Sequence, residues 1–339
     1  MRTESIDILV GAAASEPLLQ VSHLKKYFPV KGKGFLPKNE HFLHAVDDVS
    51  FSINRGEVFG LVGESGCGKT TVGKTLMRLY EPSGGEVVFN GESFLAKQGE
   101  ALRLARRDIQ MIFQDPYSSL NPRMTVREII SEPLKIYKVC GGKELDERVE
   151  HLLELVELNP WYANRYPHEF SGGQRQRIGI ARALALEPKL IVCDEPVSAL
   201  DVSVQAQVLN LLNELKEKMG LSYLFIAHDM SVVKHLSNRM GVMYLGVLVE
   251  MAERKELYEH PVHPYTQALL SAIPIPDPDV KRKRIILKGS IPSPIDPEPG
   301  CRFCKRCPYA AEMGGICHTE TPAFRDIGGG HMVACHRCK

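Results

Sequence analysis

The sequence predicts an α/β protein built on a mainly parallel sheet, and three observations support this fold class. Short apolar runs without charge recur along the chain, as is typical of strands buried on both faces of a sheet. Longer stretches with helical spacing of apolar residues lie between them. A glycine-rich pattern typical of phosphate binding follows the first run directly. Alternation of strand and helix then implies parallel strands joined by right-handed crossovers.

The apolar runs are predicted to form inner strands, because each is short and flanked by turn or polar residues. They span residues 57–63 (EVFGLVG), 190–194 (LIVCD) and 223–228 (YLFIAH). Periodicity predicts helices over residues 70–80, 146–158 and 204–220, the last of which should end at its final glycine. Residues from about Asp115 to Leu186 contain no comparable run, so we expect a helical insertion there.

Composition predicts three parts. Residues 1–17 form an N-terminal segment and residues 18–260 form the α/β domain. Residues 261–339 form an extension that includes an irregular connector, because seven prolines lie between Pro274 and Pro299 and proline disfavours both helix and inner strand. Six of the nine cysteines lie in the last 39 residues, which marks the extension as a distinct, thiol-rich part of the chain.

The overall composition excludes some classes of protein. The chain is 44% hydrophobic and 24% charged, as is usual for a soluble globular protein, and its net charge of +1 disfavours a dedicated nucleic-acid binder. The longest uncharged apolar run, residues 240–249, is about half of the roughly 20 residues that a spanning helix needs. The acidic start does not resemble a secretory signal, so we expect a cytoplasmic protein with reduced cysteines.

The run GESGCGKTT predicts a phosphate pocket between a strand and a helix. Its glycines let consecutive backbone amides point at one anion, and the helix that follows adds its positive N-terminal end. Lys69 is expected to reach the β and γ phosphates, and the Thr70 hydroxyl to ligate Mg²⁺. Cys67 is expected to be a small residue that fits the loop, with a thiol pKa that the loop can lower. The predicted pocket comprises Gly63, Glu64, Ser65, Gly66, Cys67, Gly68, Lys69, Thr70 and Thr71.

Two acids and a histidine complete this predicted site. Asp194, at the end of an apolar run, is expected to hold Mg²⁺ through water, and Glu195 to act as general base on the attacking water. A pair of acids after a strand is equally typical of a plain turn, but the phosphate loop upstream favours the catalytic interpretation. His228 ends a third strand, where ligands collect, and is expected to contact the γ-phosphate. These residues predict a nucleoside triphosphatase.

A second candidate anion pocket lies in EFSGGQRQR, residues 169–177. The phosphate loop, IFQDP, SGGQRQR, DEPVSALD and AHD together resemble, in order and spacing, the ATP-binding cassette (ABC) ATPases. The resemblance implies a P-loop NTPase fold with a parallel-sheet core, a helical subdomain at about residues 115–186 and a small Cys-rich C-terminal extension. It also implies that two cassettes pack head to tail, so that the segment Ser171, Gly172, Gly173 and Gln174 binds the γ-phosphate of ATP on the partner.

The resemblance implies three further roles. Gln114 corresponds to the glutamine that contacts Mg²⁺ and water and couples the site to membrane subunits. Asp201 corresponds to the acid that contacts the opposite subunit. Tyr27 corresponds to the aromatic that stacks on adenine, although Phe28 adjoins it and a core aromatic is the alternative. Phe170 departs from the family pattern, in which leucine is commonest before the serine.

From about residue 18 to the C-terminus the chain resembles the peptide-importer branch, in particular the second of two unlike ATPase subunits. The resemblance implies a non-identical second ATPase, two permeases and an extracytoplasmic peptide-binding protein as partners. It also implies a peripheral location on the cytoplasmic face of the membrane. Nickel and glutathione importers, and a soluble ABC protein outside transport, are the alternatives.

The cysteines of the extension resemble the C-x₅-C-P…C…C element of that branch, which is associated with a [4Fe–4S] cluster. The corresponding ligands are Cys301, Cys307, Cys317 and Cys335. The pattern here departs from the family in two extra cysteines, Cys304 and Cys338, and in two nearby histidines, His318 and His336. A tetrahedral Zn²⁺ site would use these ligands equally well, and free thiols are the third alternative.

Overall fold

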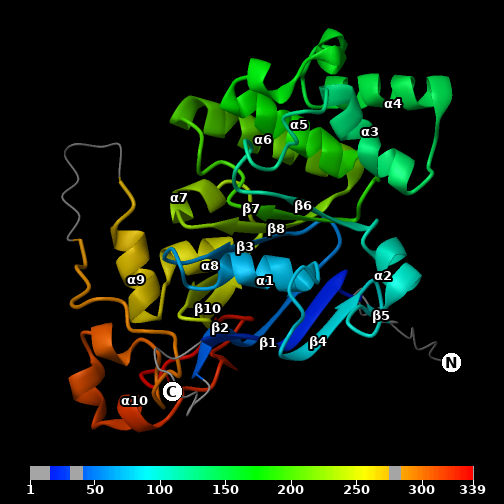
Figure 1. Cartoon of the computed structure of the whole chain (residues 1–339). Coiled ribbons are helices and arrows are strands. Elements are labelled where there is room, and N and C mark those ends of the chain that lie inside the picture. The colour runs from blue at the N-terminus through cyan, green and yellow to red at the C-terminus, as the bar shows by residue number, and fades with distance from the viewer. Residues whose placement is uncertain (1–15, 31–40, 275–283, 339) are drawn as a thin grey trace, which may run out of the picture.

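The computed structural model describes residues 16–30, 41–274 and 284–338 of the 339-residue chain. It consists of a large sheet, a smaller antiparallel sheet beneath it and a group of helices above it (Figure 1). The expectations for most of the N-terminal segment and for part of the proline-rich connector lie outside the described residues.

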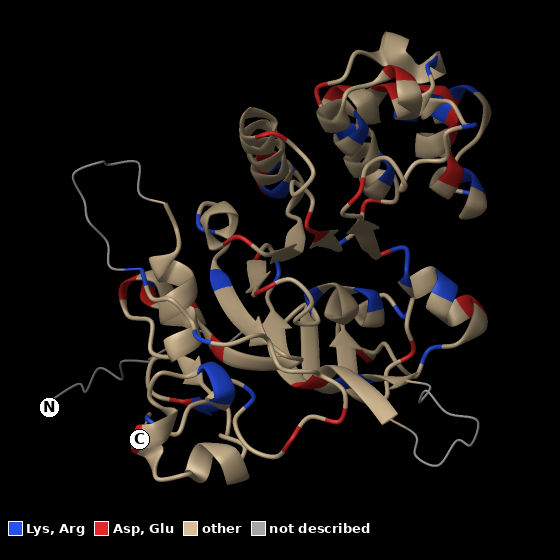
Figure 2. Ribbon diagram, turned by 60° about the vertical axis from the view of Figure 1, so that its left-hand side comes forward, with Lys and Arg blue, Asp and Glu red and all other residues tan. Residues whose placement is uncertain are grey.

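The large sheet confirms the predicted α/β core. Its three predicted strands are β3 (Val58–Val62), β7 (Leu190–Asp194) and β8 (Ser222–Ala227), and every residue in them is buried. The strands β6 (Ile109–Ile112) and β9 (Arg239–Tyr244) extend the parallel part. The strand order is β11-β12-β10-β9-β3-β8-β7-β6. The strands carry few charged residues, which lie mainly on helices and loops (Figure 2).

The smaller sheet was not predicted from the sequence. It contains β1 (Leu19–Val30), β2 (His41–Ile53), β4 (Gly84–Phe89) and β5 (Glu92–Ser93), in the order β2-β1-β4-β5. The helix α1 (Lys69–Leu76) lies between the two sheets and contacts β7 and β8 on one side and β1 and β2 on the other. One apolar core fills the space between the two sheets around α1. Because α1 is packed into this core, its start is held at the edge where the parallel strands end.

The region between β6 and β7 is helical, in agreement with the expected insertion. It contains α3 (Val126–Ile136), α4 (Gly142–Leu155), α5 (Gly172–Leu184) and short 3₁₀ segments at Pro160–Asn164 and Pro167–Glu169. The helix α6 (Val202–Met219) follows β7 and ends at Gly220, whose φ of 65° permits the predicted glycine stop. A second apolar core joins these helices to the sheet.

The remaining helices are α2 (Gly99–Ala105), α7 (Met230–Val233), α8 (Arg254–Glu259), α9 (Pro264–Ser271) and α10 (Ile316–Thr319). The strand β10 (Val247–Glu253) pairs antiparallel with β9. In the extension, β12 (Met332–Val333) pairs with β10, and β11 (Arg325–Asp326) pairs with β12. The extension is thus attached to an edge of the large sheet. Within the described ranges, every helix is too short or too polar to cross a membrane.

Candidate nucleotide site

The loop between β3 and α1 has a backbone that requires glycine. Gly63, Gly66 and Gly68 have φ values of 154°, 79° and 107°. A Cβ on Gly63 would lie 2.1 Å from the carbonyl oxygen of Met243, and one on Gly68 would lie 2.0 Å from that of Ala45. The glycines therefore allow both the turn and its close packing against β9 and β2, as the phosphate-loop pattern predicts.

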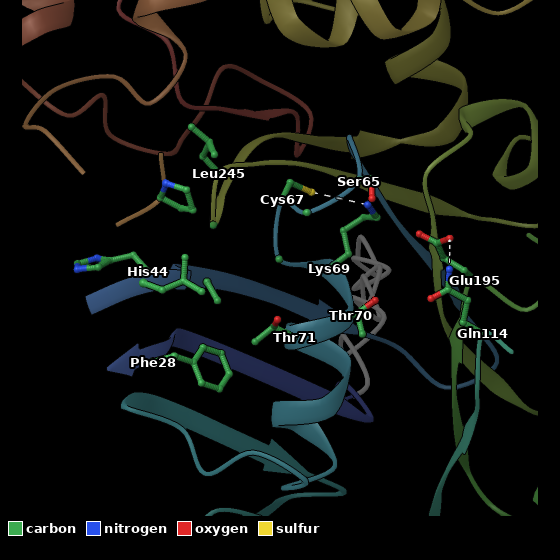
Figure 3. A pocket seen from close by; sticks show the side chains of 16 residues that line it. Phe28, His44, Ser65, Cys67, Lys69, Thr70, Thr71, Gln114, Glu195 and Leu245 are labelled. Carbon is green, nitrogen blue, oxygen red and sulfur yellow. Dashed lines mark hydrogen bonds between the residues drawn. The ribbon is translucent and has the colours of Figure 1, made fainter. Parts of the chain in front are cut away.

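This loop forms one wall of a cavity of about 290 Å³ (Figure 3). Gln114 and Glu195 lie at one end of the cavity, and the β1–β2 sheet lies at the other. Predicted residues that line it are Ser65, Gly66, Cys67, Gly68, Lys69, Thr70, Thr71, Gln114 and Glu195. Phe28, which the sequence analysis noted only as the neighbour of Tyr27, also lines it. The other lining residues, which the sequence did not indicate, are Leu43, His44, Ala45, Leu245, Gly246 and Pro294.

Lys69 places a buried positive charge at this wall. Its Nζ donates hydrogen bonds to the carbonyl oxygens of Gly63 at 2.8 Å and Glu64 at 3.0 Å, and the residue is 4% exposed. In the described part of the chain, no carboxylate lies within ion-pair distance of this ammonium.

Burial raises the pKa of the Cys67 thiol above its ordinary value, although the nearby Lys69 opposes the rise. The expected lowering of this pKa is therefore wrong.

Thr70 and Asp194 bring two oxygen ligands together. The Thr70 hydroxyl donates to Asp194 Oδ1 at 2.7 Å, although the two residues are 124 positions apart. Asp194 is 2% exposed, and burial raises its pKa while the hydrogen bond from Thr70 opposes the rise. A hydroxyl and a carboxylate side by side suit a hard cation such as Mg²⁺. The geometry therefore fits the metal that the sequence implies.

Glu195 is held at the end of β7 in a strained conformation. Its φ of 46° lies in the left-handed region, which is unfavourable for a residue with a side chain. Gln114 Nε2 donates to Glu195 Oε2 at 3.1 Å, and His228 Nδ1 lies 3.0 Å from the same oxygen. The structure thus brings the three predicted catalytic residues together, with Gln114 and Glu195 directed into the cavity (Figure 3).

At the other end of the cavity the structure places Phe28, and not Tyr27, among the lining residues. Successive side chains of a strand point to opposite faces, so only one of these neighbours can face the cavity. The Tyr27 hydroxyl donates to Asp47 Oδ1 at 2.5 Å, and its ring stacks on His44 with centroids 4.1 Å apart. The sequence indicated Phe28 only as the aromatic next to Tyr27. Two adjacent aromatics do not show which of the two faces the cavity.

The segment from Ser171 to Gln174 does not line this cavity. Ser171 caps α5: its Oγ accepts from the Gln174 amide at 3.4 Å, and the Gln174 side chain accepts from the Ser171 amide at 3.0 Å. Asp201 caps α6 in a similar way, accepting from the Val204 amide at 3.0 Å. Ser171 and Asp201 are exposed, and their helix starts pack together, since a Cβ on Gly172 would meet Leu200 at 3.3 Å.

The cysteines of the extension lie near one another without forming a metal site. The Cys301 amide donates to the Cys317 carbonyl at 2.8 Å. Burial raises the pKa of the Cys301 thiol to about 12, and the nearby Cys317 adds to the rise. Over residues 16–30, 41–274 and 284–338, no group of three or more His, Cys, Asp or Glu side chains is placed to hold a metal ion. The structure therefore gives no support to the predicted [4Fe–4S] or zinc ligands.

Comparisons with known proteins agree with these observations. A family model described as ABC transporter matches residues 46–198, and one described as oligopeptide/dipeptide transporter, C-terminal region, matches residues 249–313. The oligopeptide transport ATP-binding protein AppF of Bacillus subtilis is 53% identical over 328 residues, which are 96% of this chain and 98% of the relative. The putative peptide import ATP-binding protein BOV_A0347 of Brucella ovis is 52% identical, over 95% of this chain and 98% of the relative.

Solved structures show the same fold. The dimeric ATP-binding cassette MJ0796, bound to ADP and Pi, has a TM-score of 0.61 and 30% identity, and the match covers 70% of this chain and 98% of that one. The protein cbiO1 from Clostridium perfringens has a TM-score of 0.62 at 24% identity, with 73% and 92% covered.

Proposed function

The chain belongs to the ABC transporter family, and from this premise we propose that it is the ATP-binding and ATP-hydrolysing subunit of an oligopeptide or dipeptide importer. The observation that carries the ATPase part of the proposal is that Lys69, Thr70 and Glu195 line one cavity, with Asp194 hydrogen-bonded to Thr70. The import part rests on the similarity to peptide-transport relatives. Hydrolysis of ATP by the purified chain tests the ATPase part. Replacement of Lys69 by alanine should abolish MgATP binding, and retained binding would contradict the assignment of the loop.

Each residue of the site has a proposed task in that reaction. The amides of the phosphate loop and the Lys69 ammonium bind the β and γ phosphates. Thr70 and Asp194 hold Mg²⁺, which, when bound, neutralises charge on the phosphates. Glu195 accepts a proton from the attacking water, while Gln114 and His228 keep its carboxylate turned toward the cavity. Their shared contact to one oxygen leaves the other Glu195 oxygen available to the water.

We further propose that the segment Ser171–Gln174 and Asp201 complete the ATP site of a second cassette. Three observations support this: Ser171 and Asp201 are exposed, the segment begins a helix of 13 residues, and it does not line the cavity of its own chain. A helix start favours an anion such as the γ-phosphate. The second cassette is proposed to be a non-identical subunit, and ATP held between the two subunits would stabilise the closed dimer.

The remaining partners follow from the family. An importer of this class needs membrane permeases and a substrate-binding protein, so we propose two permeases, an extracytoplasmic peptide-binding protein and a peripheral location on the cytoplasmic face of the membrane. Purification of the chain from its native membranes in mild detergent tests this proposal. Copurification of permeases and a second cassette is expected, whereas copurification of ribosomes or nucleic acid would overturn transport but not the ATPase activity.

The [4Fe–4S] cluster is a separate proposal that rests on the resemblance of Cys301, Cys307, Cys317 and Cys335 to the cysteine element of the peptide-importer branch. Iron quantitation and visible absorbance of anaerobically purified protein test it. A brown protein with about four irons per chain would support the cluster. A colourless, zinc-loaded protein would replace it with a zinc site, and a metal-free protein would leave the cysteines as thiols.

A further inference from the structure

An arginine of the extension forms an ion pair with the phosphate-binding loop. Arg306 Nη1 donates to Glu64 Oε2 at 2.6 Å, and Nη2 donates to Glu64 Oε1 at 3.0 Å. The Arg306 side chain is 8% exposed and that of Glu64 is 27% exposed. Two parallel hydrogen bonds between a guanidinium and a carboxylate fix orientation as well as distance. The pair therefore anchors Glu64 rigidly, across 242 positions of sequence.

Glu64 is the second residue of the loop that begins at Gly63, and its backbone is also held. Its amide donates to the Tyr265 hydroxyl of α9 at 2.8 Å, and its carbonyl accepts from Lys69 Nζ at 3.0 Å. The side chain, amide and carbonyl of Glu64 thus each have a specific partner. Because the neighbouring amides of the loop must point at phosphate, the position of Glu64 sets the geometry of the anion site.

The scaffold that presents Arg306 is itself firmly docked. Phe303, three residues earlier, is 1% exposed and packs against Tyr244 and Tyr265, with ring centroids 5.2 and 5.4 Å away. Farther along, His331 Nε2 lies 2.8 Å from the buried Glu250 of β10, where β12 joins the large sheet. The extension therefore holds the Arg306 guanidinium at a defined place relative to the loop.

The charge of Glu64 gives this contact a consequence for ATP. A carboxylate on a loop that binds a triphosphate repels the ligand unless a cation neutralises it, and this repulsion is strong in a partly desolvated site. Lys69 does not neutralise Glu64, because it contacts the backbone carbonyl and not the carboxylate. Among the described residues, Arg306 is the cation that forms an ion pair with Glu64.

We infer that Arg306 is a positioning residue of the ATP site: the C-terminal extension, through Arg306 and Glu64, holds the phosphate-binding loop in the conformation that binds MgATP and cancels the charge of Glu64. The inference rests on the proposed use of residues 63–70 for the phosphates. It gives the extension a role in nucleotide binding that is independent of any metal.

Calorimetric titration of the full-length chain with MgATP tests this inference. Arg306→Gln should weaken MgATP binding about tenfold, because an unpaired carboxylate remains on the phosphate-binding loop. Glu64→Gln combined with Arg306→Gln should recover most of the affinity, since no charge is left uncompensated. A merely structural role for Arg306 would not produce this recovery. The matched control is Lys305→Gln, which removes an adjacent but exposed cation paired with Glu298 at 2.8 Å, and it should bind as the unaltered chain does.

Unchanged affinity of Arg306→Gln, or a double variant that binds no better than the single one, would overturn the inference. Arg306→Lys keeps the charge but loses the bidentate contact, and it serves if the glutamine variant does not fold. Arg306→Lys should bind MgATP more weakly than the unaltered chain does, and more tightly than Arg306→Gln if that variant folds. Full affinity of Arg306→Lys would overturn the inference. Lys69→Ala distinguishes a failure of the Arg306 inference from a failure of the proposed phosphate site. If Lys69→Ala still binds MgATP, the assignment of the loop itself is wrong.

Discussion

The phosphate loop and the segment around Ser171 are both glycine-rich turns at the start of a helix, but the structure treats them differently. Gly63, Gly66 and Gly68 adopt positive φ, and the loop that they form lines a cavity together with Lys69 and Thr70. Gly172 and Gly173 are not among the glycines with positive φ, and they begin a regular helix with an exposed cap. One region forms part of a cavity within its own chain, whereas the other presents the exposed Ser171 at its surface.

This difference is what the proposed two-subunit ATP site requires of one chain. The first half brings together a lysine, a hydroxyl and two carboxylates from α1, β7 and the residue that follows β7, and these are the groups that we propose to bind MgATP. In the second half, Ser171 and Gln174 bond to each other within the helix cap. It therefore suits a ligand that another subunit brings to it.

Among substitutions that test the difference between the two regions, the largest effect on ATP hydrolysis is expected at Glu195. Glu195→Gln should lower kcat for ATP hydrolysis by at least about a hundredfold, because an amide cannot accept the proton of the attacking water. MgATP binding should persist, since Lys69 and Thr70 are untouched, and ATP should then stabilise a closed dimer. Single-turnover hydrolysis and size-exclusion chromatography with ATP measure the two effects.

A control for this variant is Glu214→Gln on α6, which removes an exposed carboxylate 3.2 Å from Lys218 and should leave turnover unchanged. Glu195→Gln with near-normal turnover would remove the general base from the mechanism. Loss of MgATP binding in the same variant would show instead that the carboxylate helps to hold the nucleotide.

An intermediate effect is expected at Ser171. Ser171→Ala should leave MgATP binding to the isolated chain unchanged, yet lower turnover at the partner's phosphate loop in the assembled heterodimer about tenfold, the cost of one charge-assisted hydrogen bond. Turnover is measured in heterodimers in which only one phosphate loop is functional. Should the alanine variant lose turnover only at its own loop, the two-subunit site is wrong.

The loss of a helix cap needs its own control, because replacing such a serine costs about 1 kcal/mol of stability. Thr125 provides it: it caps α3 with the same reciprocal arrangement, its Oγ1 accepting from the Glu128 amide at 3.3 Å and its own amide donating to Glu128 at 2.7 Å. Thr125→Ala should destabilise the chain to a similar extent without the loss of turnover. Thermal unfolding of both variants makes the comparison quantitative.

The contrast between the two halves also explains what the sequence could predict. The phosphate loop at residues 63–70, the strand that ends at Asp194 and the strand that precedes His228 are local patterns, and the structure has the elements where the patterns place them. The sheet of β1, β2, β4 and β5 was missed because its strands are partly exposed and irregular in register, so they lack continuous apolar runs. The pair of Glu64 and Arg306 has no local signal at all, since it arises only when the extension docks.

The aromatic residue at the cavity is a second case in which a contact between distant segments could not be predicted from local sequence. The sequence places two aromatics side by side at Tyr27 and Phe28, and family resemblance pointed to the first. The hydroxyl of Tyr27 instead donates to Asp47, which also pairs with Arg302 of the extension. Arg302 lies 255 positions from Asp47 in the sequence. No pattern within β1 therefore reveals which of the two rings contacts Asp47 and which faces the cavity.

The smallest of these effects is expected at this position, and it tests the adenine end of the cavity. Phe28→Ala should weaken MgATP binding about fivefold, near the low end of the ~1–3 kcal/mol that stacking of one base on an aromatic contributes. Tyr27→Phe removes the hydrogen bond to Asp47 but keeps both rings, so it should leave the affinity for MgATP unchanged. Titration with MgATP and with magnesium triphosphate separates the base from the phosphates, because Phe28→Ala should not affect binding of triphosphate, which has no base. Weaker binding in a Tyr27→Ala variant together with normal binding in Phe28→Ala would return the adenine contact to Tyr27, and would mean that the β1–β2 sheet rearranges when nucleotide binds.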